Sequence, residues 1–115
     1  MTPGCFDWPV QYAGDTAEWR EFRISEDGAP ISLTGATIKM QVMRRRGQTP
    51  LIDITSVADD GIEITDAENG VFRVGGFTNP DINAMCVYDL EITFADGFKR
   101  TFLGGTYPIQ GQVTK

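Results

Sequence analysis

The fold is decided by Val87-Tyr88-Asp89-Leu90-Glu91-Ile92-Thr93-Phe94, a stretch in which apolar and polar side chains alternate. Successive side chains of a β-strand point to opposite faces of a sheet, so this alternation is typical of a half-buried strand. The apolar set that shares one face is Tyr88, Leu90, Ile92 and Phe94. The stretch therefore predicts a strand that packs one side on a core.

Other runs repeat the same two-residue period. The longest is Thr37-Ile38-Lys39-Met40-Gln41-Val42, and shorter ones are marked by the pairs Phe22/Ile24, Ile52/Ile54, Ile62/Ile64 and Phe72/Val74. Turn-forming residues separate the runs at 26–30, 46–50, 59–61, 68–70 and 95–97. Short strands separated by turns at this density predict an all-β sandwich or barrel. Trp19 is out of phase with the strand that follows it, so we expect it to face outward or to follow a bulge.

Two segments depart from this two-residue alternation. Thr78-Asn79-Pro80-Asp81 offers a capping residue and then a proline, which predicts one or two helical turns over residues 79–85. Apolar residues also alternate over 6–12, but Pro3, Gly4 and Pro9 limit any pairing to a sheet edge. We therefore expect residues 1–12 to form an N-terminal arm and residues 13–115 to form one β-domain.

Composition and charge narrow the range of possible functions and partners. A length of 115 residues fits one domain, and 41% hydrophobic residues suffice for one core. The net charge of −6 disfavours nucleic acid as a partner, because an acidic chain repels the phosphate backbone. The first residues lack the pattern of a signal peptide, and no stretch is apolar enough to span a membrane. We expect a protein that is made and assembled in the cytosol without a membrane partner.

The sequence offers little of the chemistry that enzymes use. It contains no His, so the commonest general base and the nucleophile–His pairs are missing. Cys5 and Cys86 lack the paired spacing of zinc ligands; a disulfide between them is possible, but reduced thiols are the default in the cytosol. Gly75-Gly76 and Gly104-Gly105 lack the form of a phosphate-binding loop. We expect no enzymatic activity, no catalytic residue, no bound metal and no cofactor.

One acidic stretch allows two interpretations. Its members are Asp59, Asp60, Glu63, Asp66 and Glu68. Calcium needs several oxygens that converge on one point, and this spacing does not match a helix–loop–helix calcium loop. We favour polar turn residues around a hairpin, with Glu63 facing solvent.

Seven residues are candidates for contacts with another protein: Phe6, Trp8, Tyr12, Trp19, Arg44, Arg45 and Arg46. The three arginines fall at an expected hairpin tip, where they either form a solvated turn that protects a sheet edge or contact an acidic partner. The aromatic residues of the arm either pack onto their own domain or dock into an adjacent subunit, where Trp and Tyr are common anchors. An outward Trp19 would extend such a contact surface.

The order of motifs along the chain resembles a known group of proteins. It begins with Tyr12-Ala13-Gly14-Asp15, continues through residues 27–36 and 88–92, and closes with Leu103-Gly104-Gly105 and a strand ending at Val113-Thr114. This resembles the small β-sandwich structural proteins of tailed bacteriophages and prophages. The nearest named likeness is to the immunoglobulin-like N-terminal domain of phage baseplate upper proteins.

The resemblance implies a virion component that is held by protein–protein contacts and needs no cofactor. We therefore expect an antiparallel β-sandwich of the immunoglobulin-like or jelly-roll type, with one short helical turn and an N-terminal arm. The expected function is that of a tail, baseplate or connector protein in the virion, oligomeric with other virion subunits. Two alternatives stay open. One is a capsid decoration protein, and the other is a carbohydrate-binding module that uses Trp8, Trp19 and Tyr107 as sugar platforms.

Overall fold

The computed structural model describes residues 4–111, and this part of the chain is all-β, as the alternation predicts. Its strands are β1 (Gly4–Cys5), β2 (Gln11–Tyr12), β3 (Arg20–Arg23), β4 (Ser25–Glu26), β5 (Ala29–Pro30), β6 (Thr37–Met43), β7 (Ile52–Thr55), β8 (Ile62–Asp66), β9 (Val71–Val74), β10 (Ala84–Thr93) and β11 (Lys99–Gln110). A short 3-10 turn, η1, spans Val57–Asp59. Residues 1–3 of the predicted arm and the predicted strand end at Val113-Thr114 lie outside the described residues.

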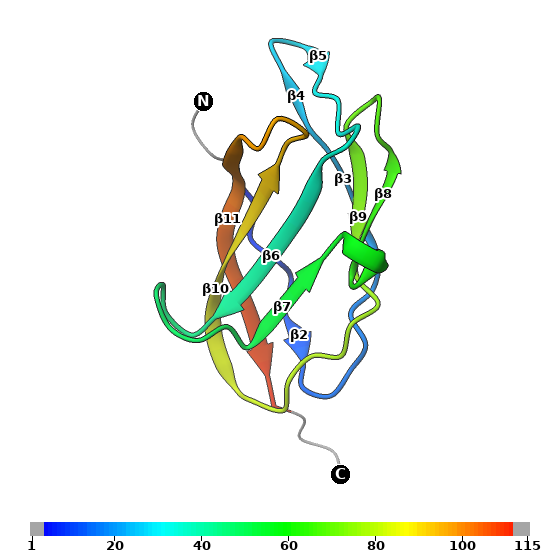
Figure 1. The fold of residues 1–115 in the computed structure, drawn as a ribbon. Helices are drawn as coiled ribbons and strands as arrows, with labels where there is room; N and C mark the ends of the chain where they lie inside the picture. The colour runs from blue at the N-terminus through cyan, green and yellow to red at the C-terminus, as the bar shows by residue number, and fades with distance from the viewer. Residues whose placement is uncertain (1–3, 112–115) are drawn as a thin grey trace.

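The strands form two main sheets and one small hairpin (Figure 1). The larger sheet has the order β1-β11-β10-β6-β7, with β2 also paired to β11, and the smaller sheet has the order β3-β9-β8. β4 and β5 form a separate hairpin. The domain is elongated, 46 Å long and 24 Å across, and the long strands run roughly along its length. No helix within residues 4–111 has the length and apolar character that crossing a membrane requires.

The alternating residues of both sheets meet in one core. On β10 the side chains of Tyr88, Leu90 and Ile92 have no exposed surface, as predicted, and the residues between them face outward. Equally buried side chains come from β6 and from the smaller sheet: Ile38, Met40, Val42, Ile62, Phe72 and Val74. The two sheets therefore lie face to face over a single apolar interior.

The N-terminal segment forms the edge of the larger sheet, where its prolines and glycine predicted it. β1 and β2 both run parallel to β11, and the N–H of Trp8 between them donates to the carbonyl of Thr106 at 2.9 Å. The alternation changes phase after Trp8, which faces the core, whereas Val10 and Tyr12 face outward. Pro9 stands at the break, and a proline has no N–H with which to continue the pairing.

Gly105 allows this segment to approach β11 closely. Its φ of 155° is unfavourable for residues with a side chain, and a Cβ there would lie 2.5 Å from the carbonyl oxygen of Phe6. The same carbonyl oxygen accepts a hydrogen bond of 2.5 Å from the hydroxyl of Tyr88. The contact between the N-terminal segment and the sheet therefore depends on a residue without a side chain at position 105.

The predicted helical turn over residues 79–85 is wrong. The chain before it pairs with the segment that leads to β3: the N–H of Ala17 donates to Phe77 at 2.8 Å, and the N–H of Asn79 donates to Asp15 at 2.9 Å. β10 then begins at Ala84. Hydrogen bonds to a distant part of the chain therefore satisfy the backbone that a helical turn would otherwise satisfy locally.

Several local predictions are confirmed. In the β4–β5 hairpin, Asp27 and Gly28 both have positive φ, 51° and 80°, as a tight hairpin of the primed type requires. The loop that holds residues 44–46 joins β6 to β7, so the arginines lie at a hairpin tip. Trp19 faces outward and is 42% exposed.

We predict that Gly105→Ala destabilises the domain by about 1–3 kcal/mol, because the added methyl group must displace the Phe6 carbonyl from β11. Gly104→Ala is the matched control, since a Cβ at that position meets its nearest neighbour at 3.5 Å, an ordinary contact. Urea unfolding followed by circular dichroism gives the free energy of unfolding of each variant. Equal losses in the two variants would contradict the close approach at Gly105.

Candidate protein-binding site

Two of the three aromatic residues of the N-terminal segment, Phe6 and Trp8, pack onto their own domain. Trp8 is 4% exposed, and its ring centroid lies 5.4 Å from that of Tyr107 in the larger sheet and 5.9 Å from that of Phe22 in the smaller sheet. Phe6 is half-buried and meets the Trp8 ring edge-on at 5.7 Å. The guanidinium of Arg20 lies over both rings. Of the two interpretations of Phe6 and Trp8, the structure shows packing within the domain.

Trp19 packs beside the outer face of the smaller sheet, where it is partly covered. The guanidinium of Arg73 lies 4.1 Å from the Trp19 ring centroid and also forms an ion pair with Glu63 at 2.7 Å. The register of the sheet places Glu21 on the other side of Arg73. This outer face is therefore charged, and its central arginine is already engaged, so Trp19 offers only part of its ring to another protein.

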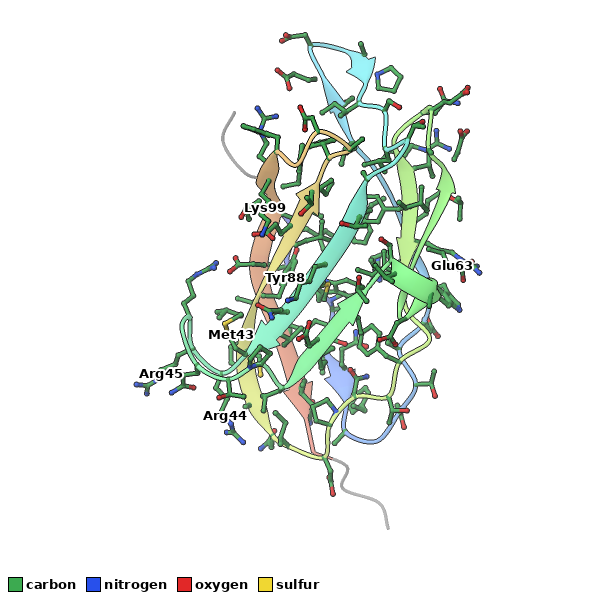
Figure 2. The ribbon with its side chains drawn as sticks, viewed as in Figure 1. Met43, Arg44, Arg45, Glu63, Tyr88 and Lys99 are labelled. Atoms are coloured by element: carbon green, nitrogen blue, oxygen red, sulfur yellow. The ribbon has the colours of Figure 1, made fainter. Side chains whose placement is uncertain are left out.

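The three predicted arginines divide into two kinds. Arg46 turns back and forms an ion pair with Asp89 on the outer face of β10. Figure 2 shows Arg44 and Arg45 pointing away from the body of the domain. Neither of these two pairs with a carboxylate within residues 4–111. The loop therefore presents two uncompensated positive charges.

Four side chains on the outer face of the larger sheet form what we call the apolar patch: Val10, Tyr12, Met85 and Pro108. Met85 lies directly opposite Pro108 in the β10–β11 pairing, and the parallel pairing of β2 with β11 brings Val10 and Tyr12 alongside. Met85 is 66% exposed, and Val10 and Tyr12 are each 48% exposed. Val10, Met85 and Pro108 also line a shallow groove of about 600 Å³. Exposed apolar side chains that cluster in this way mark binding surfaces.

The apolar patch adjoins the arginine loop. Met85 precedes the buried Cys86, whose thiol is free. Burial raises the pKa of the Cys86 thiol, and the nearby positive charge of Arg44 opposes that rise. In the pairing of β6 with β10, Met43 lies opposite Val87. Arg44 follows Met43 and therefore lies beside the start of β10, where Met85 stands, so the patch has a positive charge at its border.

The sequence predicted only part of this site. Tyr12, Arg44 and Arg45 were among the predicted interface residues, whereas Met85 was assigned to the helical turn that the structure lacks. A signal for Met85 was present, because Met85, Val87 and Asp89 continue the outward-facing set of β10. Val10 and Pro108 have no comparable signal, since their exposure depends on the pairing of two distant segments.

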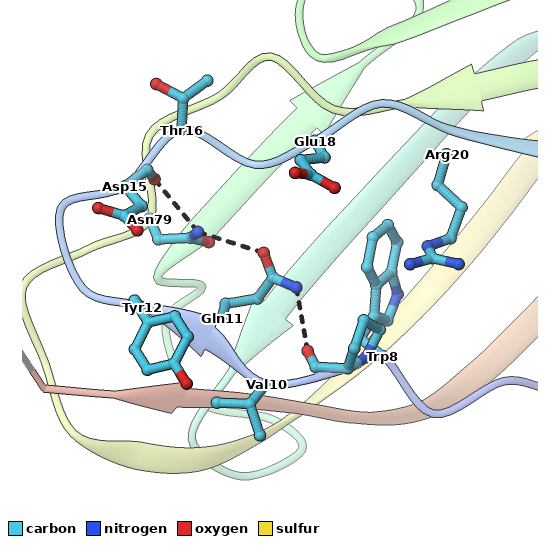
Figure 3. Close-up of a pocket in the computed structure, with 10 residues that line it drawn as sticks. Trp8, Val10, Gln11, Tyr12, Asp15, Thr16, Glu18, Arg20 and Asn79 are labelled. Carbon is cyan, nitrogen blue, oxygen red and sulfur yellow. Dashed lines mark hydrogen bonds between the residues drawn. The ribbon is translucent and has the colours of Figure 1, made fainter.

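A second hollow, of about 310 Å³, shares two residues with the apolar patch (Figure 3). Its polar groups bond mainly to other groups of the chain. The Nε2 of Gln11 donates to a backbone carbonyl two residues before it at 3.0 Å, and the Nδ2 of Asn79 donates to the carbonyl of Asp15 at 3.2 Å. Glu18 and Arg20 line the same hollow. The Nδ2 of Asn79 also donates to the Oε1 of Gln11 at 3.4 Å, so these hydrogen bonds fasten the N-terminal segment to the segment before β10, which is a structural role.

Asn79 also accepts a hydrogen bond from a buried tyrosine. The Tyr107 hydroxyl donates to the Oδ1 of Asn79 at 2.6 Å, and neither side chain has more than 2% exposure. Burial, together with the nearby Cys86, raises the pKa of Tyr107 above its ordinary value. The hydroxyl therefore remains a donor at neutral pH. Within residues 4–111, no three Cys, Asp or Glu side chains come together as a metal site requires.

Neither a scan against protein-family models nor a search of the curated proteins finds a match to this chain. No matching protein therefore indicates which residues bind a partner, and the candidate site rests on the geometry of this chain alone. It has an apolar centre on the outer face of the larger sheet and two unpaired arginines, Arg44 and Arg45, at its border. Such a surface suits another protein better than a small ligand, because it is shallow and open.

We predict that Tyr107→Phe destabilises the domain by about 1–3 kcal/mol, because it leaves the buried Oδ1 of Asn79 without its donor. The raised pKa of Tyr107 also gives a pH dependence. Its contribution to stability is complete below about pH 10, the pKa of an unfolded tyrosine, and is lost as the pH rises toward the higher folded-state pKa.

The stability of the wild type should therefore fall more steeply above about pH 10 than the stability of Tyr107→Phe. Urea unfolding of both proteins over a series of alkaline pH values measures the two slopes. Parallel pH profiles would show that Tyr107 does not titrate differently in the folded and unfolded states.

Proposed function

We propose that this protein is a structural component of a tailed-phage virion, in the tail, baseplate or connector, and that it acts through contacts with other virion subunits. The observation that carries the proposal is the apolar patch beside Arg44 and Arg45. Removal of apolar surface from water is the dominant favourable term in most protein–protein association. In this proposal the chain is made in the host cytoplasm and works in the assembled particle without catalysis or a cofactor.

The order of the strands supports an immunoglobulin-like sandwich as the fold. In that fold one sheet holds strands G, F and C, extended by C′ in variable-type domains, and the other holds strands B, E and D beside A. The order β11-β10-β6-β7 fits G-F-C-C′, and the order β3-β9-β8 fits B-E-D. This arrangement favours the immunoglobulin-like form over a jelly roll, and it supports the resemblance to the N-terminal domain of phage baseplate upper proteins.

The difference between the two outer faces supports binding through one of them. The smaller sheet presents Arg73 between Glu21 and Glu63, a row of charges that water solvates well. The larger sheet presents Met85 and the rest of the apolar patch at one end. A partner that covers this patch gains hydrophobic stabilisation without having to break ion pairs of the smaller sheet.

The alternative functions find less support. Of the three aromatic residues that a carbohydrate-binding module would use, Trp8 and Tyr107 are buried, and the guanidinium of Arg73 lies over Trp19. Sugar platforms need an exposed ring face, so this alternative loses its main residues. A capsid decoration protein would use the same patch, and the position of the protein within the particle separates it from a tail component.

Tailed phage particles should be purified from the bacterial strain whose genome, or whose infecting phage, encodes this chain. Quantitative mass spectrometry should find the chain in these particles in a fixed ratio to the other virion proteins. Met85→Glu places a charge in the apolar patch and should reduce the incorporated amount at least about tenfold. Immunogold labelling of the same particles separates a tail position from a capsid position.

Val57→Glu is the matched control for this experiment. Val57 is 59% exposed, but it belongs to η1 and lies outside the patch, so its replacement should leave incorporation unchanged. Particles that lack the wild-type chain would overturn the proposed function. Equal incorporation of Met85→Glu and wild type would show that the apolar patch is not the contact.

A further inference from the structure

The end of the domain opposite the apolar patch is acidic. Met85 is the second residue of β10, and the β10–β11 turn follows the far end of this strand, so the length of β10, roughly 25 Å, separates the patch from that turn. The β4–β5 and β8–β9 turns lie at the same end as the β10–β11 turn (Figure 1). The exposed carboxylates of these three turns are Glu26, Asp27, Asp66, Glu68 and Asp96. We call this region the acidic end.

The cations near the acidic end are fewer, and most of them already have partners. They are Arg23, Lys99 and Arg100. Arg23 lies 3.8 Å from a carboxylate oxygen of Glu21, and Arg100 lies 3.6 Å from one of Glu26. Asp27 and Glu68 form no ion pair within residues 4–111. The acidic end therefore keeps an excess of negative charge.

Phe98 gives the acidic end an apolar contact point. It lies in the β10–β11 turn and is 56% exposed. The guanidinium of Arg100 lies 5.6 Å from its ring centroid, and the pair between Arg100 and Glu26 links this turn to the β4–β5 hairpin. The acidic end therefore has an exposed aromatic ring among its turns, and the apolar patch has arginines at its border, so the two ends complement each other.

We propose that two copies of this chain bind end to end, with the acidic end of one copy on the apolar patch of the next. The inference rests on the proposed function and deepens it, because it names a second copy as one of the subunits that the patch contacts. Phe98 of one copy meets Met85 and its neighbours, and the carboxylates of the acidic end meet Arg44 and Arg45. Such opposed charges steer association and fix its orientation.

Charge selects this arrangement over the symmetric ones. Two facing acidic ends would bring their carboxylates together, and two facing patches would leave the acidic ends of both copies without a contact. Like charges across an interface are disfavoured, whereas the end-to-end contact pairs opposite charges. The contact is heterologous, so each bound copy keeps one end free for the next and the series forms a ring or a filament.

Two variants test the contact, each with one end blocked by an added carboxylate. Met85→Glu blocks the apolar patch, and Phe98→Glu blocks the acidic end; both residues are exposed, so both variants should fold. Each variant alone should associate at least about tenfold more weakly than the wild type. An equimolar mixture should form heterodimers and nothing larger, because the intact patch of Phe98→Glu binds the intact acidic end of Met85→Glu.

Sedimentation velocity of the purified full chain, at low and at high salt, measures these species. The wild type should form dimers and larger assemblies at low salt and fewer at high salt, because salt screens exposed charges. Val57→Glu is the control, since it adds the same charge outside both ends and should behave as the wild type does. Circular dichroism of each variant checks that it is folded.

A wild-type protein that stays monomeric at low salt, or a mixture of folded variants that stays monomeric, would overturn the end-to-end contact. Restored association in the mixture, with Val57→Glu unaffected, would support it. The particle experiment on Met85→Glu is independent of these measurements. Incorporation that depends on Met85, together with a monomeric wild type, would leave the proposed function standing while this inference fails.

Discussion

The contact between the N-terminal segment and β11 is the interaction on which the rest of the structure depends. The carbonyl oxygen of Phe6 lies against Gly105 and accepts a hydrogen bond from the hydroxyl of Tyr88. This contact places Trp8 between the sheets, where its ring meets Tyr107 of the larger sheet and Phe22 of the smaller one. The segment therefore completes the larger sheet and closes the shared core. Truncation of such a buried Trp typically costs about 3–5 kcal/mol, a large part of the stability of a small domain.

The same contact builds the candidate binding site. Once Trp8 faces inward, the break in pairing at Pro9 turns Val10 and Tyr12 outward, beside the start of β10 and the end of β11. The hydrogen bonds of Asn79 hold the neighbouring segment in place. The patch is therefore formed by parts of the chain that are distant in sequence and fixed before any partner arrives. Because the surface is already ordered, binding of a partner costs little conformational entropy.

The charges that favour solubility differ from the charges that we propose for recognition. The excess of carboxylates gives a net charge of −6, which favours solubility. Much of the charge on the body of the domain is engaged locally, as in the ion pairs of Arg73 with Glu63 and of Arg46 with Asp89. Arg44 and Arg45 are not engaged in this way, and they border Met85, the most exposed large hydrophobic side chain among the described residues. Carboxylates gather in the turns of the acidic end, whereas Arg44 and Arg45 lie beside the apolar patch, so the two ends of the elongated domain differ in charge.

The sequence by itself determined the all-β class, because a strict two-residue alternation such as that of residues 87–94 suits only a strand with one buried face. It also determined the hairpin turns, because Asp27-Gly28 tolerates the positive φ that a tight turn requires. Only the tertiary structure decided what these strands meet. Asn79 has the local character of a helix start, yet hydrogen bonds with Asp15 and Tyr107 hold it in an extended segment. From the sequence, Trp8 fitted a core position and an interface position equally well. The pairing of its segment with β11 buries it in the core. A local pattern fixes which face of a strand a side chain is on, but not which residue lies next to it across the sheet.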